Sequence, residues 1–452
     1  MTTTRTSDRS ARTLHRTSGP VVALGLPVLW TAVWVGLRPA GVPWRTFAGQ
    51  LSGALAILLM ATAVVLISML RWVEAWFDGI DRAAIWHRRL AITGMLLLAP
   101  HLLLSGNDRP SAIGPGLAVG SLLGLLALVV WSVLPRWRSV LPRVVRGVVA
   151  RAVATPPARL VDRLLGGYDR WRAVHRLTGL FLGIGFLHGL LDATAFGGSA
   201  VLRWSYVAVG GIGLAFYAYR ELLARRFLPL HDFEVAAVVP VGEGLTEISL
   251  RPLGRRFSFV PGQFAMVFLE ARDGWHRHPF TIASGAAEDH LRITVKALGD
   301  WTGGVADVVA PGMPAVVGGP HGRFDHRKAR GDQVWIAGGV GVTPFLSWLR
   351  SLEHHPAAGR VDFFYTSAED PVPYAEEIAA LAARHGVGVH LFGTAAGRRL
   401  GVPAVLAAVP GQPGDLSVFL CGPEGLVSAM TSGCREAGVP RRRIHREYFD
   451  WR

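Results

Sequence analysis

The sequence is poor in cysteine, and this scarcity excludes two kinds of site. Cys421 and Cys434 are the only cysteines among 452 residues. Two thiols are too few for a disulfide framework or for an iron–sulfur cluster. The first 19 residues also lack the short apolar core and small-residue cleavage site of a secretory signal. We therefore predict a cytoplasmic N-terminal tail over residues 1–19. The sequence has no calcium-binding loop pattern either, so calcium activation is not indicated.

Acidic residues are scarce relative to basic ones. The chain has 47 Lys and Arg against 32 Asp and Glu, a formal net charge of +15. A charge of this size can indicate a nucleic-acid partner. Here the basic residues gather in short loops between apolar runs, where membrane topology explains them without nucleic acid. The 50% hydrophobic content and the mean hydropathy of +0.33 predict one part within a membrane and one part outside it.

Six apolar stretches approach the roughly 20 residues that a membrane-spanning helix requires. They cover residues 20–37, 47–70, 88–105, 112–134, 175–192 and 203–222. Arginine is abundant before the first stretch and in every second loop, and it is sparse in the loops between. Because positively charged loops stay on the cytoplasmic side, this pattern predicts six spans. We expect a multi-pass protein of the plasma membrane, surrounded by lipid, with both termini in the cytoplasm.

Four histidines lie in two of these apolar regions: His87 and His101 in one, His175 and His188 in the other. An ionisable ring is costly inside a bilayer and usually marks a functional site. The first pair is offset by 14 residues, which spans about 21 Å and returns to within ~40° of the same helix face. The second offset, 13 residues, misses by roughly 140°. The second helix therefore needs a local bulge, unless its histidines are approached from different sides.

Two histidines on each of two helices form a suitable set of axial ligands for two b-type haems. His87 and His175 would hold the haem nearer the cytoplasm, and His101 and His188 the outer one. The alternative is four ordinary interfacial histidines. The matched depth of the two pairs favours ligation.

The offsets of these pairs resemble those of the haem-ligating histidines in the NADPH oxidase and ferric reductase transmembrane superfamily. The resemblance implies a multidomain membrane protein that passes electrons from NAD(P)H through FAD and two haems b. Its fold would be a six-helix transmembrane haem domain over residues 20–230, an antiparallel β-barrel flavin domain over 231–330 and an α/β nicotinamide-binding domain over 331–452.

Short β-rich runs at 234–239, 246–250, 264–268 and 291–295, separated by Gly and Pro, predict a small antiparallel barrel. Within it, residues 278–284 resemble the flavin motif of the ferredoxin reductase family, and residues 296–302 resemble its diphosphate motif. By this resemblance Phe280 lies along the flavin and Thr281 hydrogen-bonds the isoalloxazine. A lysine and backbone N–H groups suit a diphosphate, which favours FAD over FMN. The flavin-binding residues so assigned are His278, Pro279, Phe280, Thr281, Ser284, Lys296, Gly299, Asp300, Trp301 and Thr302.

The last third of the chain alternates strand and helix patterns. Residues 334–337 predict a strand that runs into a glycine-rich turn and then a helix, an arrangement that lets a phosphate approach a helix N-terminus. Cys421-Gly422-Pro423 resembles the superfamily's nicotinamide-side motif, with the cysteine near the hydride-donating ring. The alternative is that Cys421 has no role at the nicotinamide and is simply a small buried residue. The nicotinamide-binding residues so assigned are Gly338, Gly339, Gly341, Thr343, Pro344, Arg398, Gly422 and Pro423.

The chain ends on an aromatic segment. In this superfamily a C-terminal aromatic residue covers the flavin until nicotinamide displaces it, and Trp451 is the candidate. The alternative is a terminal tryptophan docked for packing. The chain departs from NADPH-specific members near residues 365–370, where no cation stands and Glu369 and Asp370 would repel a 2′-phosphate. Because Arg398 and Arg399 can compensate, we predict NADPH, with NADH as the alternative.

The electron acceptor at the outer face is the least defined part of the prediction. Arg203 is a candidate to attract superoxide or an anionic chelate, and Asp192 a candidate to deliver a proton. Both can equally be solvated loop-end charges, the interpretation we favour for Asp192. The predicted function is reduction of O2 to superoxide. The alternatives are ferric-chelate reduction and electron transfer to a membrane or extracytoplasmic partner protein. The paired histidines disfavour a transporter with a regulatory nucleotide domain.

Overall fold

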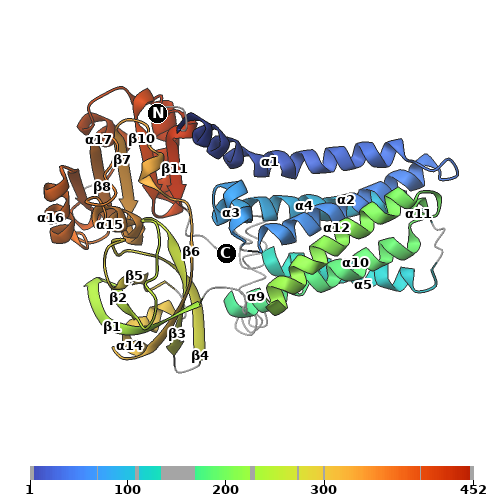
Figure 1. The fold of residues 1–452 in the computed structure, drawn as a ribbon, viewed down its shortest axis with the longest axis horizontal. Coiled ribbons are helices and arrows are strands. Elements are labelled where there is room, and N and C mark those ends of the chain that lie inside the picture. The colour runs from blue at the N-terminus through green and yellow to red at the C-terminus, as the bar shows by residue number, and fades with distance from the viewer. Residues whose placement is uncertain are drawn as a thin grey trace. The chain divides into compact units, whose positions relative to one another are not determined.

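The computed structural model describes residues 5–68, 70–106, 111–133, 168–223, 230–271, 274–298, 301–397 and 399–447. The chain divides into two compact units, with the boundary between residues 227 and 228. The N-terminal unit is built of helices and the C-terminal unit of two sheets with flanking helices (Figure 1).

Six long helices make up most of the described part of the N-terminal unit. They are α1 (Arg5–Gly36), α2 (Trp44–Leu66), α4 (Ile80–Leu104), α5 (Gly114–Val133), α10 (Thr178–Asp192) and α12 (Ala200–Ala218). Shorter segments lie between them, namely α3 (Arg71–Phe77), α9 (Tyr168–His175) and α11 (Ala195–Gly198), and the π-helical turn η2 (Tyr219–Leu223) follows α12. Helix α1 already begins at Arg5, inside the segment expected to be a tail.

Five helical stretches in the described part of the chain are long and apolar enough to cross a membrane. They are Ser18–Gly36, Trp44–Leu66, Gly114–Ser132, Ala173–Asp192 and Ala200–Leu223. They correspond to five of the six spans that the sequence predicts. The remaining predicted span lies in α4, whose first half carries Arg82, Arg88 and Arg89 and is therefore less apolar.

Helix α2 is the central helix of the N-terminal unit. It contacts α1, α4, α10 and α12, and most of its side chains are buried. Small residues let its neighbours approach closely, as is usual for helices packed in a membrane. A Cβ on Gly49 would lie 2.7 Å from the backbone of Leu104, and one on Gly53 would lie 2.7 Å from the ring of His101.

The helix that carries His175 and His188 is interrupted between the two. Helix α9 ends at His175 and α10 begins at Thr178. The amides of Leu177 and Gly179 donate to carbonyls three residues back, at 3.0 and 3.3 Å. Such bonds wind the chain more tightly than an α-helix. The break lies between the two histidines, in the stretch where the 13-residue offset predicts a local irregularity.

The first sheet of the C-terminal unit contains six antiparallel strands. In chain order they are β1 (Leu230–Gly242), β2 (Leu245–Pro252), β3 (Phe264–Ala271), β4 (Gly274–Thr281), β5 (Leu291–Lys296) and β6 (Pro314–His321). Their spatial order is β4-β3-β6-β1-β2-β5. One antiparallel bridge, between Ile282 and Ile293, joins the chain just after β4 to β5 at the opposite edge. The short helix α14 (Val305–Val308) contributes Val305 to the apolar core.

The second sheet contains five parallel strands in the order β11-β10-β7-β8-β9. Its strands are β7 (Gln333–Gly338), β8 (Val361–Ser367), β9 (Gly388–Gly393), β10 (Ser417–Cys421) and β11 (Ile444–Glu447). The helices are α15 (Thr343–Leu349), α16 (Ala375–His385), α17 (Val402–Ala408) and α18 (Glu424–Glu436). Every residue of β7 and β10 is buried, as expected for a parallel sheet covered on both faces. The carboxyl ends of β7 and β10 lie side by side, Ala337 being paired with Cys421.

Candidate functional site

The four histidines come together as two pairs in the N-terminal unit. The ring centroids of His87 and His175 are 6.4 Å apart, and those of His101 and His188 are 6.0 Å apart. Two imidazoles that ligate one metal from opposite sides have centroids ~6 Å apart, because the metal lies about 2 Å from each ligating nitrogen. Both spacings therefore fit one iron atom between the rings.

Each of the four rings has an oxygen atom close to Nδ1. These oxygens are Ala63 O at 2.8 Å from His87, Gly49 O at 2.9 Å from His101, Ser132 Oγ at 3.0 Å from His175 and Asp192 Oδ2 at 3.2 Å from His188. A ligating histidine commonly uses its other ring nitrogen in this way, which fixes the ring and keeps Nε2 free for the metal. The polar surroundings of all four rings therefore suit ligation through Nε2.

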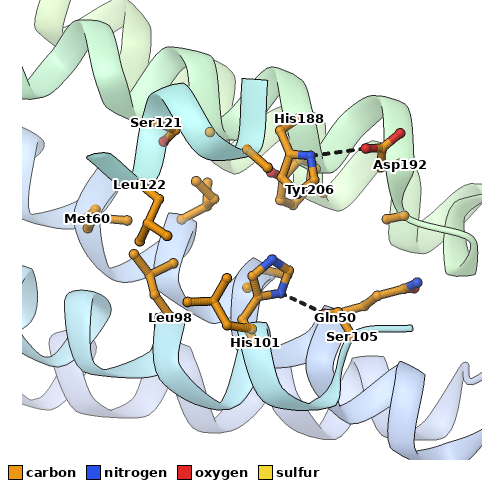
Figure 2. A pocket seen from close by; sticks show the side chains of 18 of the residues that line it. Gln50, Met60, Leu98, His101, Ser105, Ser121, Leu122, His188, Asp192 and Tyr206 are labelled. Carbon is orange, nitrogen blue, oxygen red and sulfur yellow. Dashed lines mark hydrogen bonds and ion pairs between the residues drawn. The ribbon is translucent and has the colours of Figure 1, made fainter. Parts of the chain in front are cut away.

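The outer pair lines a cavity with a volume of about 180 Å³. Figure 2 shows His101 and His188 facing each other across it, among apolar side chains that include Leu98 and Leu122. Two imidazoles are too few to hold a metal ion by themselves. In the part of the chain that the structure describes, no three His, Cys, Asp or Glu residues gather to hold one. A porphyrin supplies the missing nitrogen ligands, so this donor set fits haem.

Asp192 is buried beside the outer pair. Its side chain is 6% exposed, and its Oδ1 accepts the backbone N–H of Ser111 at 3.2 Å. The carboxylate fills the space where a side chain on Gly114 would lie. The interpretation of Asp192 as a solvated charge is therefore wrong, because α10 ends against the start of α5. Arg203, near the start of α12, is exposed.

The two predicted flavin motifs meet where β4 and β5, the two edge strands of the antiparallel sheet, contact each other. On β4, the ring of His278 stacks on that of Trp301, with centroids 4.6 Å apart and planes at 19°. The ring of Phe280 is 6.5 Å from Trp301. Thr281 and Ser284 are buried. Gly299 and Asp300 lie outside the described residues, so the structure brings together only part of the predicted diphosphate motif.

Lys296 lies near the glycine-rich turn of the second sheet. Its Nζ is 3.8 Å from the place that a Cβ on Gly339 would occupy, and Gly339 has a positive φ of 53° that favours glycine. Thr343 and Pro344 follow this turn and open α15, both buried. The structure thus places a flavin-domain cation beside the predicted phosphate-binding turn.

The nicotinamide-side motif packs against the same turn. A Cβ on Gly341 would lie 2.6 Å from the carbonyl carbon of Cys421, and one on Gly422 would lie 3.0 Å from the backbone of Gly338. Glycine is therefore required where the ends of β7 and β10 touch. Pro423 directly precedes α18. The thiol of Cys421 is fully buried, and burial raises its pKa well above the usual value. Arg398 and Trp451 lie outside the described residues, and their roles stay predictions.

Sequence reasoning missed the oxygen atoms that lie near the four Nδ1 atoms. Asp192 stands four residues after His188 in the same helix, a spacing that places two side chains on one face, so this partner had a local signal. Ala63 and Gly49 offer only backbone oxygens, for which a sequence has no signal.

The C-terminal half matches known flavoproteins. A family model described as an FAD-binding domain matches residues 230–342. The chain is 29% identical over 203 residues to the ferredoxin reductase component of 3-ketosteroid-9-alpha-monooxygenase from Rhodococcus rhodochrous, covering 43% of this chain and 57% of that protein. It is 27% identical over 172 residues to NADPH oxidase 3 of Homo sapiens, covering 35% and 28%. It is 29% identical over 208 residues to a superoxide-generating NADPH oxidase heavy chain of Dictyostelium discoideum, covering 40% and 37%.

Among solved structures, the FAD/NAD-binding domain of nitric oxide dioxygenase from Vibrio cholerae aligns with a TM-score of 0.42 at 22% identity, covering 48% of this chain and 98% of that one. The chain spans little more than half, or less, of the length of these curated relatives. Residues 230–342 therefore match an FAD-binding domain, and the C-terminal half is similar in sequence to flavin-dependent oxidoreductases. The N-terminal half, with its apolar helices, lies outside the FAD-binding match.

Proposed function

We propose that this chain is a transmembrane oxidoreductase that passes electrons from cytoplasmic NAD(P)H through FAD and two b-type haems to O2 at the outer face, forming superoxide. The observation that carries the proposal is the pairing of four histidines at two depths, at 6.4 and 6.0 Å, each with an oxygen at Nδ1. The relatives named NADPH oxidase support the choice of electron donor and acceptor.

When bound, FAD would supply the conversion of a two-electron hydride into single electrons, and the haems would supply single-electron transfer. The chain's own residues bind and orient. Phe280 and Thr281 hold the flavin ring, Lys296 neutralises phosphate, and the glycine turn at 338–341 admits the nicotinamide dinucleotide. The main electron path needs no side chain as nucleophile or general base.

The proposal includes six spans, with α4 as the sixth. This helix has 25 residues and so measures about 37 Å at 1.5 Å per residue, enough to cross the roughly 30 Å of a bilayer core. The polar rings of His87 and His101 face partners on other helices and are not left to lipid. With both termini in the cytoplasm, His101 and His188 lie toward the outer face, and the antiparallel sheet is a barrel closed beyond the bridge of Ile282 with Ile293.

The experiment is reconstitution of the purified protein in vesicles of defined lipid, with NAD(P)H added on the flavin side and with O2, a ferric chelate or a quinone as acceptor. We expect a haem-to-flavin ratio of two with a b-type spectrum and reoxidation by O2. The variants His101→Ala and His188→Ala should each lose one haem, whereas His290→Ala, at an exposed position after Asp289, should lose none. Full haem content in the first two variants rejects the ligand assignment. Haem that is reduced but reoxidised by no small acceptor would favour the partner-protein alternative.

A further inference from the structure

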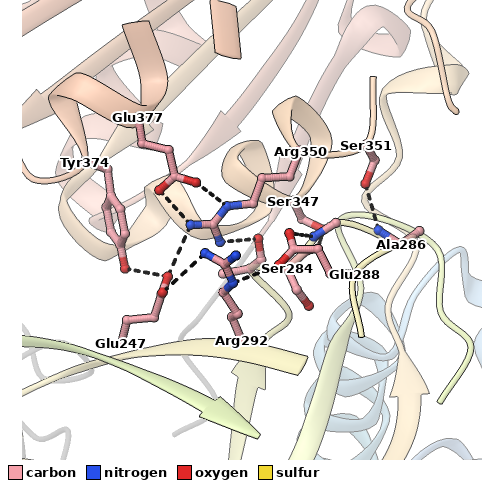
Figure 3. Close-up of polar contacts among 12 residues, drawn as sticks. Glu247, Ser284, Ala286, Glu288, Arg292, Ser347, Arg350, Ser351, Tyr374 and Glu377 are labelled. Carbon is pink, nitrogen blue, oxygen red and sulfur yellow. Dashed lines mark hydrogen bonds and ion pairs between the residues drawn. The ribbon is translucent and has the colours of Figure 1, made fainter. Parts of the chain in front are cut away.

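A buried arginine joins the two sheets of the C-terminal unit. Arg350 follows α15, and its side chain is 4% exposed. Its Nε and Nη2 donate to both carboxylate oxygens of Glu377 at 2.7 and 2.8 Å. Its Nη1 donates to the carbonyl of Ala283 at 2.8 Å, and its Nη2 to Glu247 at 3.3 Å. Figure 3 shows Arg350 at the centre of these contacts.

The partners of Arg350 belong to different domains. Glu377 lies on α16, beside the parallel sheet. Glu247 lies on β2 of the antiparallel sheet, and Ala283 follows β4. Ala283 is two residues after Thr281, the residue assigned to the flavin ring. Helix α15, seven residues long, begins directly after the glycine-rich turn. The nicotinamide-binding turn is therefore connected to the chain after the flavin-binding strand β4 through the short helix α15 and the side chain of Arg350.

Side chains in and just after α15 also bind the flavin-domain backbone, near Ala283 and at Pro261. Ser347 Oγ donates to the carbonyl of Ser284 at 2.8 Å. Trp348 Nε1 donates to the carbonyl of Pro261 at 3.0 Å. Just beyond the helix, Ser351 Oγ accepts the amide of Ala286 at 3.0 Å. Arg350 differs from these three residues because its guanidinium binds acceptors on both domains at once.

The acidic partner on β2 is itself held in place. Glu247 Oε2 accepts the hydroxyl of Tyr374 at 3.2 Å, and that hydroxyl is 2.8 Å from Thr294 Oγ1 on β5. Arg292 Nη1 lies 3.6 Å from the other oxygen of Glu247. Because a guanidinium presents five donors in one plane and an ammonium presents only a point charge, lysine cannot reproduce this set of contacts.

We propose that Arg350 is a positioning residue for hydride transfer, holding the backbone that follows the flavin strand at a fixed place against the nicotinamide domain. The inference rests on the proposed function. In the step concerned, a hydride leaves the reduced nicotinamide, which is oxidised, and bonds to the flavin, which is reduced. Arg350 touches neither ring. It acts through Ala283, and so it sets the distance and angle between the two rings, on which such a transfer depends steeply.

The test is anaerobic stopped-flow reduction of the flavin by NADPH and by NADH in the full-length, FAD-loaded protein. The variants are Arg350→Met, Arg350→Lys and the control Arg384→Met. Arg384 also pairs with a glutamate, Glu353, at 2.9 Å, but their side chains are 63% and 59% exposed. We expect Arg350→Met to keep its FAD, to lower the limiting rate of flavin reduction at least tenfold, and to change the half-saturating NAD(P)H concentration less than threefold. The long-wavelength absorbance of the stacked flavin–nicotinamide pair should weaken in parallel. Arg350→Lys should recover only a minor part of the rate.

A purely structural role predicts a different result. Melting temperature would fall while the limiting rate and the long-wavelength absorbance stayed within twofold of the unchanged protein, and that outcome overturns the proposal. If Arg350→Met fails to hold FAD, Glu377→Gln replaces it, since this change keeps the arginine but loosens its hold on α16. Retention of the full rate in Glu377→Gln would then also overturn the proposal. Failure of the unchanged protein to reduce its flavin with either nicotinamide rejects the proposed function instead.

Discussion

Gly53 on α2 provides the sharpest test of the outer haem site. A Cβ built there lies 2.7 Å from Nδ1 of His101, 3.0 Å from Cε1 and 3.2 Å from Cγ. Ordinary van der Waals contact begins at 3.4 Å, so the imidazole in Gly53→Ala must move by about 0.7 Å. Metal–ligand distances vary by only ~0.2 Å, so this movement is too large for His101 to keep its bond to the metal. The move also disturbs the contact between Nδ1 and Gly49 O, now 2.9 Å.

We expect Gly53→Ala to lose the outer haem and keep the inner one. The haem-to-flavin ratio, from the pyridine haemochrome and from released FAD, should fall from two toward one. The added methyl group costs about 1–3 kcal/mol in a packed site, so the protein should still fold and bind FAD. The matched control is Gly211→Ala on α12, where a Cβ meets nothing within 4 Å. Its stability should hold or rise, because alanine favours a helix by about 0.5–1 kcal/mol over glycine. An unchanged haem content in Gly53→Ala would refute the proposed place of His101.

Three further predictions concern the C-terminal half. In Gly341→Ala the new methyl group meets the backbone of Cys421, so the KM for NAD(P)H should rise at least tenfold with unchanged FAD content. The control Gly425→Ala, where a Cβ meets nothing within 4 Å, should leave this KM unchanged. Burial raises the pKa of Cys434 from 9.0 to about 11 and that of Cys421 well above 9.0, so neither thiol should react with a maleimide in the native protein at pH 8. Because the folded-state pKa values are raised, this stabilising contribution is complete below about pH 9 and is lost as the pH rises through 11. Denaturant titrations at pH 8 and pH 10.5 should show a lower free energy of unfolding at the higher pH. In Cys434→Ala this difference between the two pH values should be smaller. Trp451→Ala should alter nicotinamide affinity and flavin accessibility, and identical kinetics would remove its assigned role.

Much of the fold could be predicted because its patterns are local. Apolar stretches of bilayer length predict helices wherever they occur, and five of the six are helices apolar enough to cross a membrane. The strand patterns at 246–250 and 291–295 fall within β2 and β5, since alternation of side chains between two faces needs no distant partner. The predicted span in α4 is not among these five, because its histidines and arginines weaken the hydropathy signal that reveals spans.

Details of the site depend on residues far apart in the chain. His87 and Ala63 are separated by 24 residues, His101 and Gly49 by 52, and Asp192 and Ser111 by 81. Asp192 looks like a solvated charge from sequence because only the packing of α10 against the start of α5 removes it from water. Arg350 has no sequence signal for the same reason, since its acceptors come from β2, from the chain after β4 and from α16.

The sequence by itself determined that four histidines stand in apolar segments at two depths and that flavin and nicotinamide motifs follow in order, because residue type and spacing are properties of the chain. Only the tertiary structure decided which atoms face each other. It pairs the rings at 6.4 and 6.0 Å, breaks the helix after His175, and supplies an oxygen to every Nδ1. These are consequences of packing, which brings distant backbone and side chains within hydrogen-bonding distance.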